Sequence, residues 1–244
     1  MMKLSIPNKD LFLNNFLISI GKIAESATLK ITPGRIDSLV STSDNTGIIS
    51  ISYEDSSIDC EAVLNIPDVK KLCRVLQCIE TPGFELSISS NNISYTSKTI
   101  RFKYHLYDDG IVTVPKIDLK KLETIDFDSK FTLAYSSLTS LVKGSTIATD
   151  TNKIYLTFID NEVHGELTDH VRANTDSYGL LISSDYTGKL NSKPLPLNFE
   201  IFRIISSMKF TTSTCNIASL LGVMTFNIEL EKTKIKFIIS ALAN

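Results

Sequence analysis

The chain repeats one order of helical and strand-like patterns, and this repeat restricts its possible folds more than any other feature. Each pass opens with a helical pattern, continues with short strands, and closes with a second helix and further strands. Apolar residues at three-and-four spacing predict the helices, and short, partly alternating segments between turn residues predict the strands. The four predicted helices are Asn8–Ile20, Pro67–Ile79, Phe131–Val142 and Asn198–Met208.

Two domains follow from the repeat. The first helices of the two passes begin about 120 residues apart, as expected of an internal duplication. The segment between the passes contains Asp108-Asp109-Gly110 and Pro115, which is typical of an extended connector. We therefore predict similar domains at residues 1–107 and 122–244, joined by a connector at residues 108–121.

The composition is that of an ordinary globular protein, with 43% hydrophobic and 21% charged residues. Because the formal net charge is -2, no overall positive charge indicates nucleic-acid binding, and any contact with DNA requires a local basic surface. The chain has no apolar run of about 18 residues, no signal-peptide pattern and no C-x-x-C pair among its four cysteines. We expect a reduced, cytoplasmic protein without a membrane span.

Segments distributed over nearly the whole chain carry a resemblance to a known family. They are Leu11–Ile20, Ala27–Thr32, Cys60–Leu76, Phe84–Leu106, Asn198–Lys209, Val223–Glu229 and Lys234–Leu242. Their layout resembles that of DNA sliding clamps related to proliferating cell nuclear antigen, and most closely the tailed-bacteriophage branch. The resemblance implies an α+β DNA-clamp fold, in which each of two similar domains packs two helices against antiparallel sheets.

The resemblance also implies a function. Phage clamps of this kind are rings of three two-domain subunits that encircle duplex DNA without reading its sequence and tether the replicative polymerase. The implied partners are duplex DNA, a DNA polymerase, a clamp loader and two further copies of the chain, in the cytoplasm of the infected host if a phage encodes it. Ring closure is expected to join two edge strands, Thr99–Leu106 and Tyr178–Ser183. No catalytic residue, cofactor or metal is implied.

Positive charge on the predicted helices is the surface that a clamp needs against phosphate. On Pro67–Ile79, three cations project away from the apolar stripe, and the predicted helices carry few acids. A solvated surface would explain the cations of any single helix, but the same bias on several helices of a mildly acidic chain favours DNA. The predicted DNA-binding residues are Lys9, Lys70, Lys71, Arg74, Lys143, Arg203 and Lys209.

A second predicted surface would bind partner proteins. In sliding clamps, polymerase and loader peptides dock in an apolar pocket near the connector, and the resemblance places that role at matching positions of this chain. These positions are Ile111, Val112, Val114, Ile117, Ala241 and Leu242. Packing at the domain junction is the alternative explanation for each of them, whereas an exposed apolar patch would indicate binding.

Acidic pairs and histidines provide no catalytic or metal-binding pattern. Glu54-Asp55 and Asp108-Asp109 adjoin turns, which predicts solvated carboxylates. His164 and His170 flank acids, but their spacing matches no set of metal ligands. Two other classes of protein stay open: a β-rich viral structural or assembly protein that polymerises through its sheet edges, and a glycoside hydrolase with paired carboxylates. The basic helices argue against the first, and the sequence shows no facing acids for the second.

Overall fold

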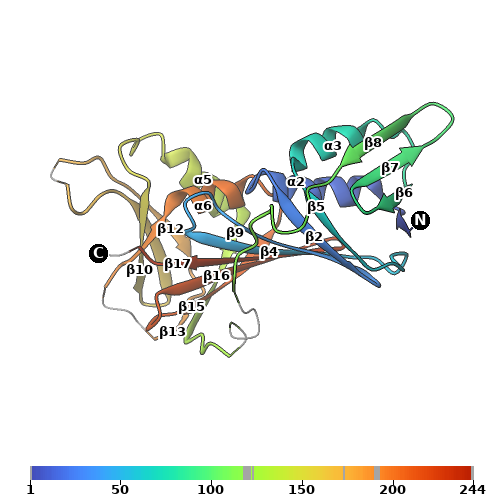
Figure 1. The fold of residues 1–244 in the computed structure, drawn as a ribbon. Coiled ribbons are helices and arrows are strands. Elements are labelled where there is room, and N and C mark those ends of the chain that lie inside the picture. The colour runs from blue at the N-terminus through green and yellow to red at the C-terminus, as the bar shows by residue number, and fades with distance from the viewer. Residues whose placement is uncertain (1, 118–121, 123, 173, 190–192, 243–244) are drawn as a thin grey trace. The chain divides into compact units, whose positions relative to one another are not determined.

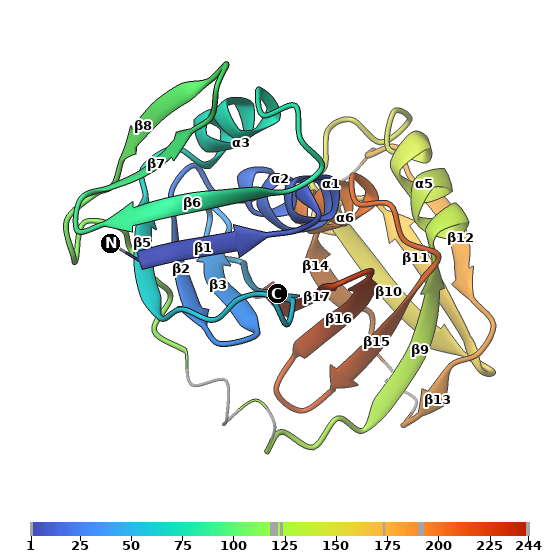
Figure 2. The ribbon, with the colours of Figure 1, turned by 90° about the vertical axis from the view of Figure 1, so that its right-hand side faces the viewer.

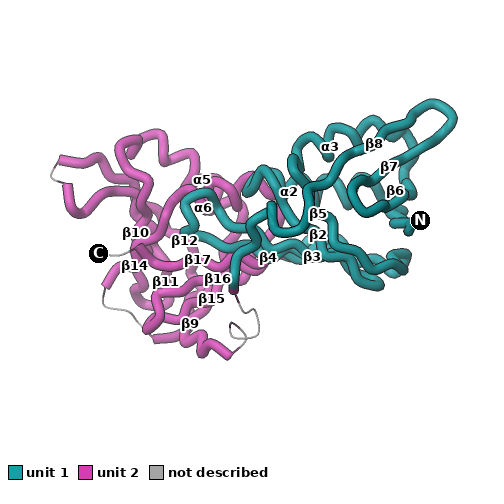
Figure 3. The backbone as a smooth tube through the Cα atoms, viewed as in Figure 1, with its two compact units in different colours: residues 1–116, 229–235 teal, residues 117–228, 236–244 magenta. Residues whose placement is uncertain are grey.

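Figure 1 and Figure 2 show the computed structural model from two sides, and it describes residues 2–117, 122, 124–172, 174–189 and 193–242. The chain divides into two compact units, coloured separately in Figure 3. Unit 1 comprises residues 1–116 and 229–235, and unit 2 comprises residues 117–228 and 236–244. Compactness alone does not show where a domain folds independently, so the boundaries placed at residues 108–121 stay a prediction. No helix in the described ranges is both long enough and apolar enough to cross a membrane.

Unit 1 contains two sets of four antiparallel strands and two helical segments. One set has the strand order β1-β6-β7-β8, and the other has the order β5-β2-β3-β4. The elements are β1 (Met2–Ile6), α1 (Lys9–Leu11), η1 (Phe12–Leu17), α2 (Ile18–Gly21), β2 (Ala27–Thr32), β3 (Arg35–Ser41), β4 (Gly47–Glu54), β5 (Ala62–Ile66), α3 (Val69–Gln77), β6 (Phe84–Ser89), β7 (Asn92–Thr96) and β8 (Arg101–His105).

The first helical segment of unit 1 is continuous but is not a uniform α-helix. Asn8 caps it, because its side chain accepts a hydrogen bond from the Leu11 N–H at 3.0 Å. Its central part, η1, has π-helical hydrogen bonding between the α-helical turns α1 and α2. The predicted apolar stripe is confirmed despite this irregularity. Its buried residues are Phe12, Leu13, Phe16, Leu17 and Ile20.

Aromatic contacts join this helical segment to both sets of strands in unit 1. The Phe12 ring lies edge-on to Tyr53 of β4, with ring centroids 5.2 Å apart, and edge-on to Phe84 of β6 at 6.2 Å. Edge-to-face pairs at these distances add to the stabilisation that burial of the rings provides. The helix therefore forms the centre of the unit 1 core.

Unit 2 also contains two sets of antiparallel strands and two helices. The strand orders are β13-β9-β15-β16-β17 and β12-β11-β10-β14. The elements are β9 (Ser129–Ala134), α5 (Tyr135–Gly144), β10 (Lys153–Ile159), β11 (Glu162–Leu167), β12 (Tyr178–Ser183), β13 (Thr187–Gly188), β14 (Leu195–Asn198), α6 (Phe199–Ser206), β15 (Thr212–Ala218), β16 (Val223–Leu230) and β17 (Thr233–Ser240). The first residues of β17 belong to unit 1.

The two units repeat one strand order. The order β1-β6-β7-β8 of unit 1 corresponds to β9-β15-β16-β17 of unit 2, and β4-β3-β2-β5 corresponds to β12-β11-β10-β14. In both units a helical segment follows the first strand, and a second helix precedes the last three strands. The duplication predicted from the sequence pattern is therefore confirmed at the level of topology.

Two predicted helix starts are wrong. The segment predicted as the helix Phe131–Val142 begins as strand β9, and helix α5 starts only at Tyr135. Pro67 does not lie in the first turn of its helix, because Asp68 is the N-cap and α3 begins at Val69.

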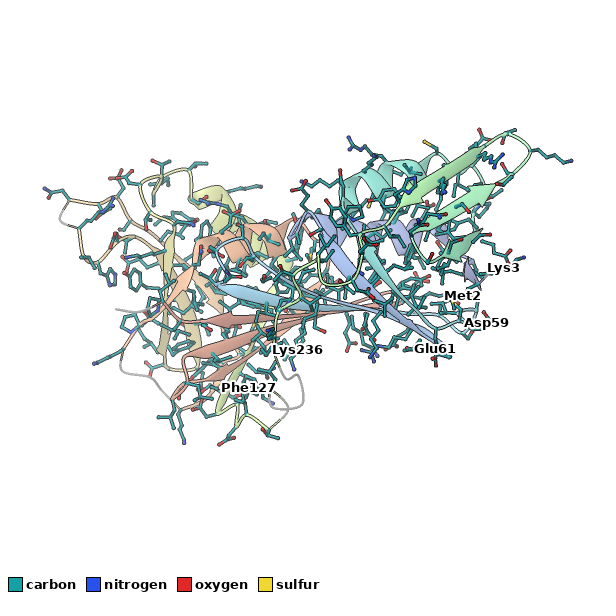
Figure 4. All side chains as sticks on the ribbon, in the orientation of Figure 1. Met2, Lys3, Asp59, Glu61, Phe127 and Lys236 are labelled. Carbon is teal, nitrogen blue, oxygen red and sulfur yellow. The ribbon has the colours of Figure 1, made fainter. Side chains whose placement is uncertain are left out.

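Strand β1 was not predicted. Figure 4 labels its residues Met2 and Lys3, which are exposed, whereas Leu4 and Ile6 are buried. The strand pairs antiparallel with β6 over its full length. Its short alternation at the chain start is too brief to predict a strand without knowledge of β6.

Candidate nucleic-acid interface

Helix α3 carries more basic residues than any other helix in the described part of the chain. Asp68 begins the helix, because its Oδ1 accepts a hydrogen bond from the Lys71 N–H at 2.7 Å. Helical spacing then separates a buried side from an exposed side. The buried residues are Val69, Leu72, Cys73 and Leu76, and the exposed cations are Lys70, Lys71 and Arg74. None of the three cations forms an ion pair with another described residue.

A polar groove of about 490 Å³ lies where the end of α2 meets the start of α3. Its cations are Lys22, Lys70 and Arg74, and its carboxylates are Glu25 and Asp68. The two helices approach closely here, since a Cβ added at Gly21 would lie 3.5 Å from the Lys70 side chain. Sequence reasoning missed Lys22, although its position just beyond the end of a predicted helix was an available signal. We call Lys22, Lys70, Lys71 and Arg74 the α3 cluster.

Lys9 has a different environment from the α3 cluster. Its ammonium donates a hydrogen bond to the carbonyl oxygen of Ile79, just past the end of α3, and its side chain is half-buried. Lysine commonly satisfies the last carbonyls of a helix in this way. The contact gives Lys9 a structural role, and DNA binding by Lys9 stays a prediction.

The predicted DNA-binding residues of unit 2 are more scattered. Lys143 is exposed in the last turn of α5, and Lys209 is exposed beyond the end of α6. Arg203 lies on α6 but is already engaged: it pairs with Glu200 at 3.1 Å and covers the Phe199 ring at 4.8 Å. Because Glu200 offsets Arg203, helix α6 contributes no net positive charge, and the basic helical surface is concentrated in unit 1.

Two edge strands differ in the sign of the charge that they display, because cations lie on β8 and acids lie on β11 next to β12. Strand β8 is outermost in its set, and its Arg101, Lys103 and His105 side chains are exposed. Strand β12 is outermost in its set, and the neighbouring β11 carries Glu162 and Glu166, which are 43% and 45% exposed. Each glutamate also contacts a histidine, His164 and His170 respectively. The predicted edges Thr99–Leu106 and Tyr178–Ser183 thus correspond to β8 and β12.

The predicted partner-binding residues differ in exposure. In unit 1, Ile111 and Val114 are 57% and 39% exposed, whereas Val112 is buried. In unit 2, Ile117, Ala241 and Leu242 are half-buried. The Ala241 N–H donates to the Gly222 carbonyl at 2.6 Å, and the Leu242 N–H donates to the Pro196 carbonyl at 2.9 Å. The exposed members, Ile111 and Val114, are the ones available to another protein, and the role of the whole group stays a prediction.

Within the acidic pair Glu54-Asp55, Asp55 is structural rather than solvated, whereas the Glu54 side chain is 43% exposed. Asp55 is buried, and its carboxylate accepts hydrogen bonds from Lys232 and Ser57, which corrects the expectation of a solvated turn. Burial alone would raise the pKa of Asp55, but these hydrogen bonds outweigh it and hold the pKa below its ordinary value. Within the described ranges, no group of three or more histidine, cysteine or acidic side chains could hold a metal ion.

Among comparisons with known proteins, only the comparison of structures gave matches. No family model matches the chain, and no curated protein matches its sequence. A solved complex described as the C-terminal region of FEN-1 bound to A. fulgidus PCNA matches with a TM-score of 0.77 and 13% identity, over 100% of this chain and 99% of that chain. The chain has the DNA-clamp fold. Proliferating cell nuclear antigen from Entamoeba histolytica matches with a TM-score of 0.74 and 13% identity, over 99% of this chain and 98% of that chain.

These matches confirm the predicted clamp fold of mixed helices and antiparallel sheets. Because both alignments extend over almost the full length of both chains, the likeness includes both units rather than one of them. At 13% identity the likeness is one of fold, so the DNA-binding and partner-binding residues must be argued from the side chains of this chain.

Proposed function

We propose that this chain is the subunit of a DNA sliding clamp, a non-enzymatic ring of three copies that encircles duplex DNA and tethers a replicative polymerase. The observation that carries the proposal is the clamp fold together with the α3 cluster. The proposal extends to a tailed-bacteriophage clamp that acts in the cytoplasm of the host, and this finer part is supported by the sequence resemblance.

The α3 cluster suits contact with a sliding duplex. Lys70, Lys71 and Arg74 lie on the exposed side of α3 and form no ion pair with another described residue. Lys22 is exposed just past the end of α2. Phosphate contacts carry no sequence information, so such a surface attracts any duplex. The remaining helices add few cations, so the attraction between the protein and phosphate is confined to the α3 cluster. A weak, local attraction of this kind lets the ring slide along the DNA.

Ring closure is supported by the repeated strand order. In unit 1, the segment Glu229–Ile235, where β17 begins, runs along the end of β4: the Glu54 N–H donates to the Lys232 carbonyl at 2.8 Å, and Lys234 pairs with the Glu54 carboxylate at 3.1 Å. In the repeat, β8 takes the place of β17, and β12 takes the place of β4. An equivalent contact between β8 of one copy and β12 of the next would join copies head to tail and satisfy both edges.

The charges beside these edges support the same pairing. Arg101 and Lys103 on β8 would approach Glu162 and Glu166 beside β12 of the next copy. Complementary charges steer association and fix its register. The contact inside the chain has the same polarity, with lysine on β17 and glutamate on β4.

Partner binding is the third part of the proposal. A clamp of this fold is described in complex with the C-terminal region of another protein, FEN-1. We propose that polymerase and clamp-loader peptides dock on the connector of this chain through Ile111 and Val114, which are exposed apolar residues. Exposed apolar side chains in a connecting segment are a common basis for such docking.

Topological retention on DNA tests the proposed function. The protein is mixed with a nicked circular plasmid at about 1 M NaCl and diluted to about 0.05 M, so that ion-pair-dependent rings close around the DNA. Gel filtration then separates bound from free protein. We expect the wild-type chain to elute with the circular plasmid and to be released when a restriction enzyme linearises it.

The control for this experiment is a matched charge reversal. Lys70→Glu, Lys71→Glu and Arg74→Glu together should reduce the retained protein, whereas the same change at Lys30, Lys116 and Lys130, which are exposed outside the helices, should not. Equal retention on linear and circular plasmid, or no retention on either, would contradict encirclement. Equal effects of the two triple variants would contradict the role of the α3 cluster.

A further inference from the structure

A cavity of about 260 Å³ in unit 2 has no place in the proposed contacts with DNA or between copies. It is formed by the start of β10, the segment after β11, the segment that leads into β14, and the end of the described chain. The lining residues are Lys153, Tyr155, His170, Val171, Lys193, Pro194, Pro196 and Leu242. Cavities that hold drug-sized ligands begin at about 300 Å³, so this one suits a single bulky side chain better.

The aromatic wall of the cavity is firmly held. Tyr155 alternates along β10 with Ile154 and Leu156, which face the core, so its ring lies on the opposite face. It stacks on His170 with ring centroids 3.9 Å apart and an angle of 8° between the planes. His170 is itself hydrogen-bonded to Glu166 at 3.1 Å. Contacts within the chain therefore hold this wall in place.

The opposite wall is made by prolines and the chain end. Pro196 lies on the edge strand β14, and its carbonyl accepts a hydrogen bond from the Leu242 N–H at 2.9 Å. Proline has no N–H to donate, so Pro194 and Pro196 give an incoming strand few partners on this edge. Addition of a strand at this edge is therefore unfavourable, and a side chain inserted into the cavity is the better fit.

The charge around the cavity is positive. Lys153 and Lys193 are in the lining, and the lining contains no carboxylate. Two acids outside the lining contact these residues: Glu166 bonds to His170 at 3.1 Å, and Asp169 lies 3.4 Å from Lys153 and 3.5 Å from Arg172. The cations Lys153, Lys193 and Arg172 outnumber these two carboxylates. Lys193 forms no ion pair in the parts of the chain that the structure describes.

The rim of the cavity displays an apolar side chain that the fold does not use. Val171 is 82% exposed, although its backbone N–H is fixed by a hydrogen bond to the Asp169 carboxylate at 3.1 Å. Covering an exposed apolar side chain with a ligand removes apolar surface from water, which stabilises the complex. Together with the lysines, Val171 indicates which chemistry the ligand should have.

We propose that this cavity binds a peptide segment of a partner protein that inserts one bulky apolar side chain and places carboxylates beside Lys153 and Lys193. The inference adds a second docking site to the proposed clamp and rests on the scaffold role of that proposal. It differs from the docking proposed at Ile111 and Val114, because neither residue lines the cavity, and Leu242 is the one predicted partner-binding residue that does.

Fluorescence anisotropy with short labelled peptides tests the inference on the full chain without DNA. The probe has a central phenylalanine flanked by aspartate and glutamate, and the comparison peptides replace the phenylalanine by serine or the acids by lysine. We expect the acidic phenylalanine peptide to bind below about 1 mM, and both comparison peptides to bind about tenfold more weakly or not at all.

Variants of exposed residues locate the binding. Val171→Asp and Lys193→Glu should each weaken the acidic phenylalanine peptide about fivefold or more. Their matched controls are Val63→Asp, at a valine that is 56% exposed on β5, and Lys116→Glu, and both should leave binding unchanged. Absence of binding, equal binding of the lysine peptide, or equal effects of the variants and their controls would overturn the inference. Ring formation is measured by plasmid retention and peptide binding by anisotropy, so a failure of one is distinguished from a failure of the other.

Discussion

The buried carboxylate of Asp55 holds the turn between β16 and β17 next to the end of β4, within unit 1. Lys232, which supplies its ammonium partner, lies in the turn between β16 and β17 and has a left-handed backbone with φ of 58°. Such a backbone is uncommon for lysine. The ion pair and the hydrogen bond from the Glu54 N–H to the Lys232 carbonyl compensate for that conformation.

Removal of the Lys232 ammonium should destabilise the protein. Lys232→Asn keeps a residue that tolerates the left-handed backbone but leaves Asp55 without its cation, and we expect the free energy of unfolding to fall by about 1–3 kcal/mol. Urea unfolding measures the change. Lys98→Asn, in the turn of the equivalent hairpin between β7 and β8, is the control and should change it by less than about 0.5 kcal/mol. A loss of the same size in both variants would show that the Asp55 pair contributes nothing specific.

Asp55 should also contribute to acid sensitivity. Burial opposes its ionisation, but Lys232 and Ser57 lower its pKa below the ordinary 3.8, so the unfolded chain takes up this proton more readily than the folded one. Its stabilisation is therefore present above about pH 4 and is lost as the pH falls through the folded pKa. Asp55→Asn should lose stability near neutral pH but show a smaller further loss between about pH 5 and about pH 3. Identical pH profiles of the urea midpoint would refute this role.

At the residue scale, the sequence predicted which side chains are exposed better than it predicted which contacts they form. The helical spacing correctly placed Lys70, Lys71 and Arg74 on the solvent side of α3. The same reasoning could not predict that Arg203 is engaged with Glu200 and the Phe199 ring, or that Lys9 reaches the Ile79 carbonyl. The Ile79 contact joins residues 70 positions apart, and spacing along one helix carries no information about it.

At the element scale, the misplaced start of α5 has a physical cause. In the segment from Phe131 to Val142, Phe131 and Leu133 alternate as in a strand, while Leu138 and Leu141 follow helical spacing. Both patterns can be drawn through these residues, so periodicity alone does not locate the change from β9 to α5. Pairing of β9 with β15 decides it, and that partner lies about 80 residues further along the chain.

The end of α5 provides a test of packing between elements. A Cβ added at Gly144, the last residue of α5, would overlap the ring of Tyr178 on β12. Alanine normally stabilises a helix relative to glycine by up to about 1 kcal/mol, but here we expect Gly144→Ala to destabilise the protein by about 1–3 kcal/mol. Thermal or urea unfolding reports the sign of the change.

Gly21 is the matched control for Gly144. It is the last residue of α2, and an added Cβ would make only ordinary contacts at 3.5 Å. Gly21→Ala should therefore be neutral or slightly stabilising. If Gly144→Ala were equally neutral, the Tyr178 ring would not fix the position of α5 against β12.

At the scale of the whole molecule, the proposed ring predicts a defined mass. Three copies of the 27.1 kDa chain give about 81 kDa. Because the proposed contact pairs Arg101 and Lys103 with Glu162 and Glu166, we expect sedimentation to show this species at low salt and smaller species at about 1 M NaCl.

A charge swap tests the contact directly. Arg101→Glu with Lys103→Glu should abolish the 81 kDa species, and adding Glu162→Lys with Glu166→Lys to the same chain should restore part of it. Reversal of Lys30 and Lys130, which lie on other strands, should leave the mass unchanged. A monomer in the wild type at high concentration and low salt would refute the ring, and a swap that restores nothing would refute this pairing.

The repeated strand order has a consequence for direction. Copies that join β8 to β12 make unlike contacts at their two ends, so a closed ring has a rotation axis but no two-fold axis across it, and its two faces differ. Every copy then presents Leu242 and the cavity that it lines in the same orientation about the ring axis. A protein captured there would keep one fixed orientation relative to the two faces of the ring, whichever copy captured it.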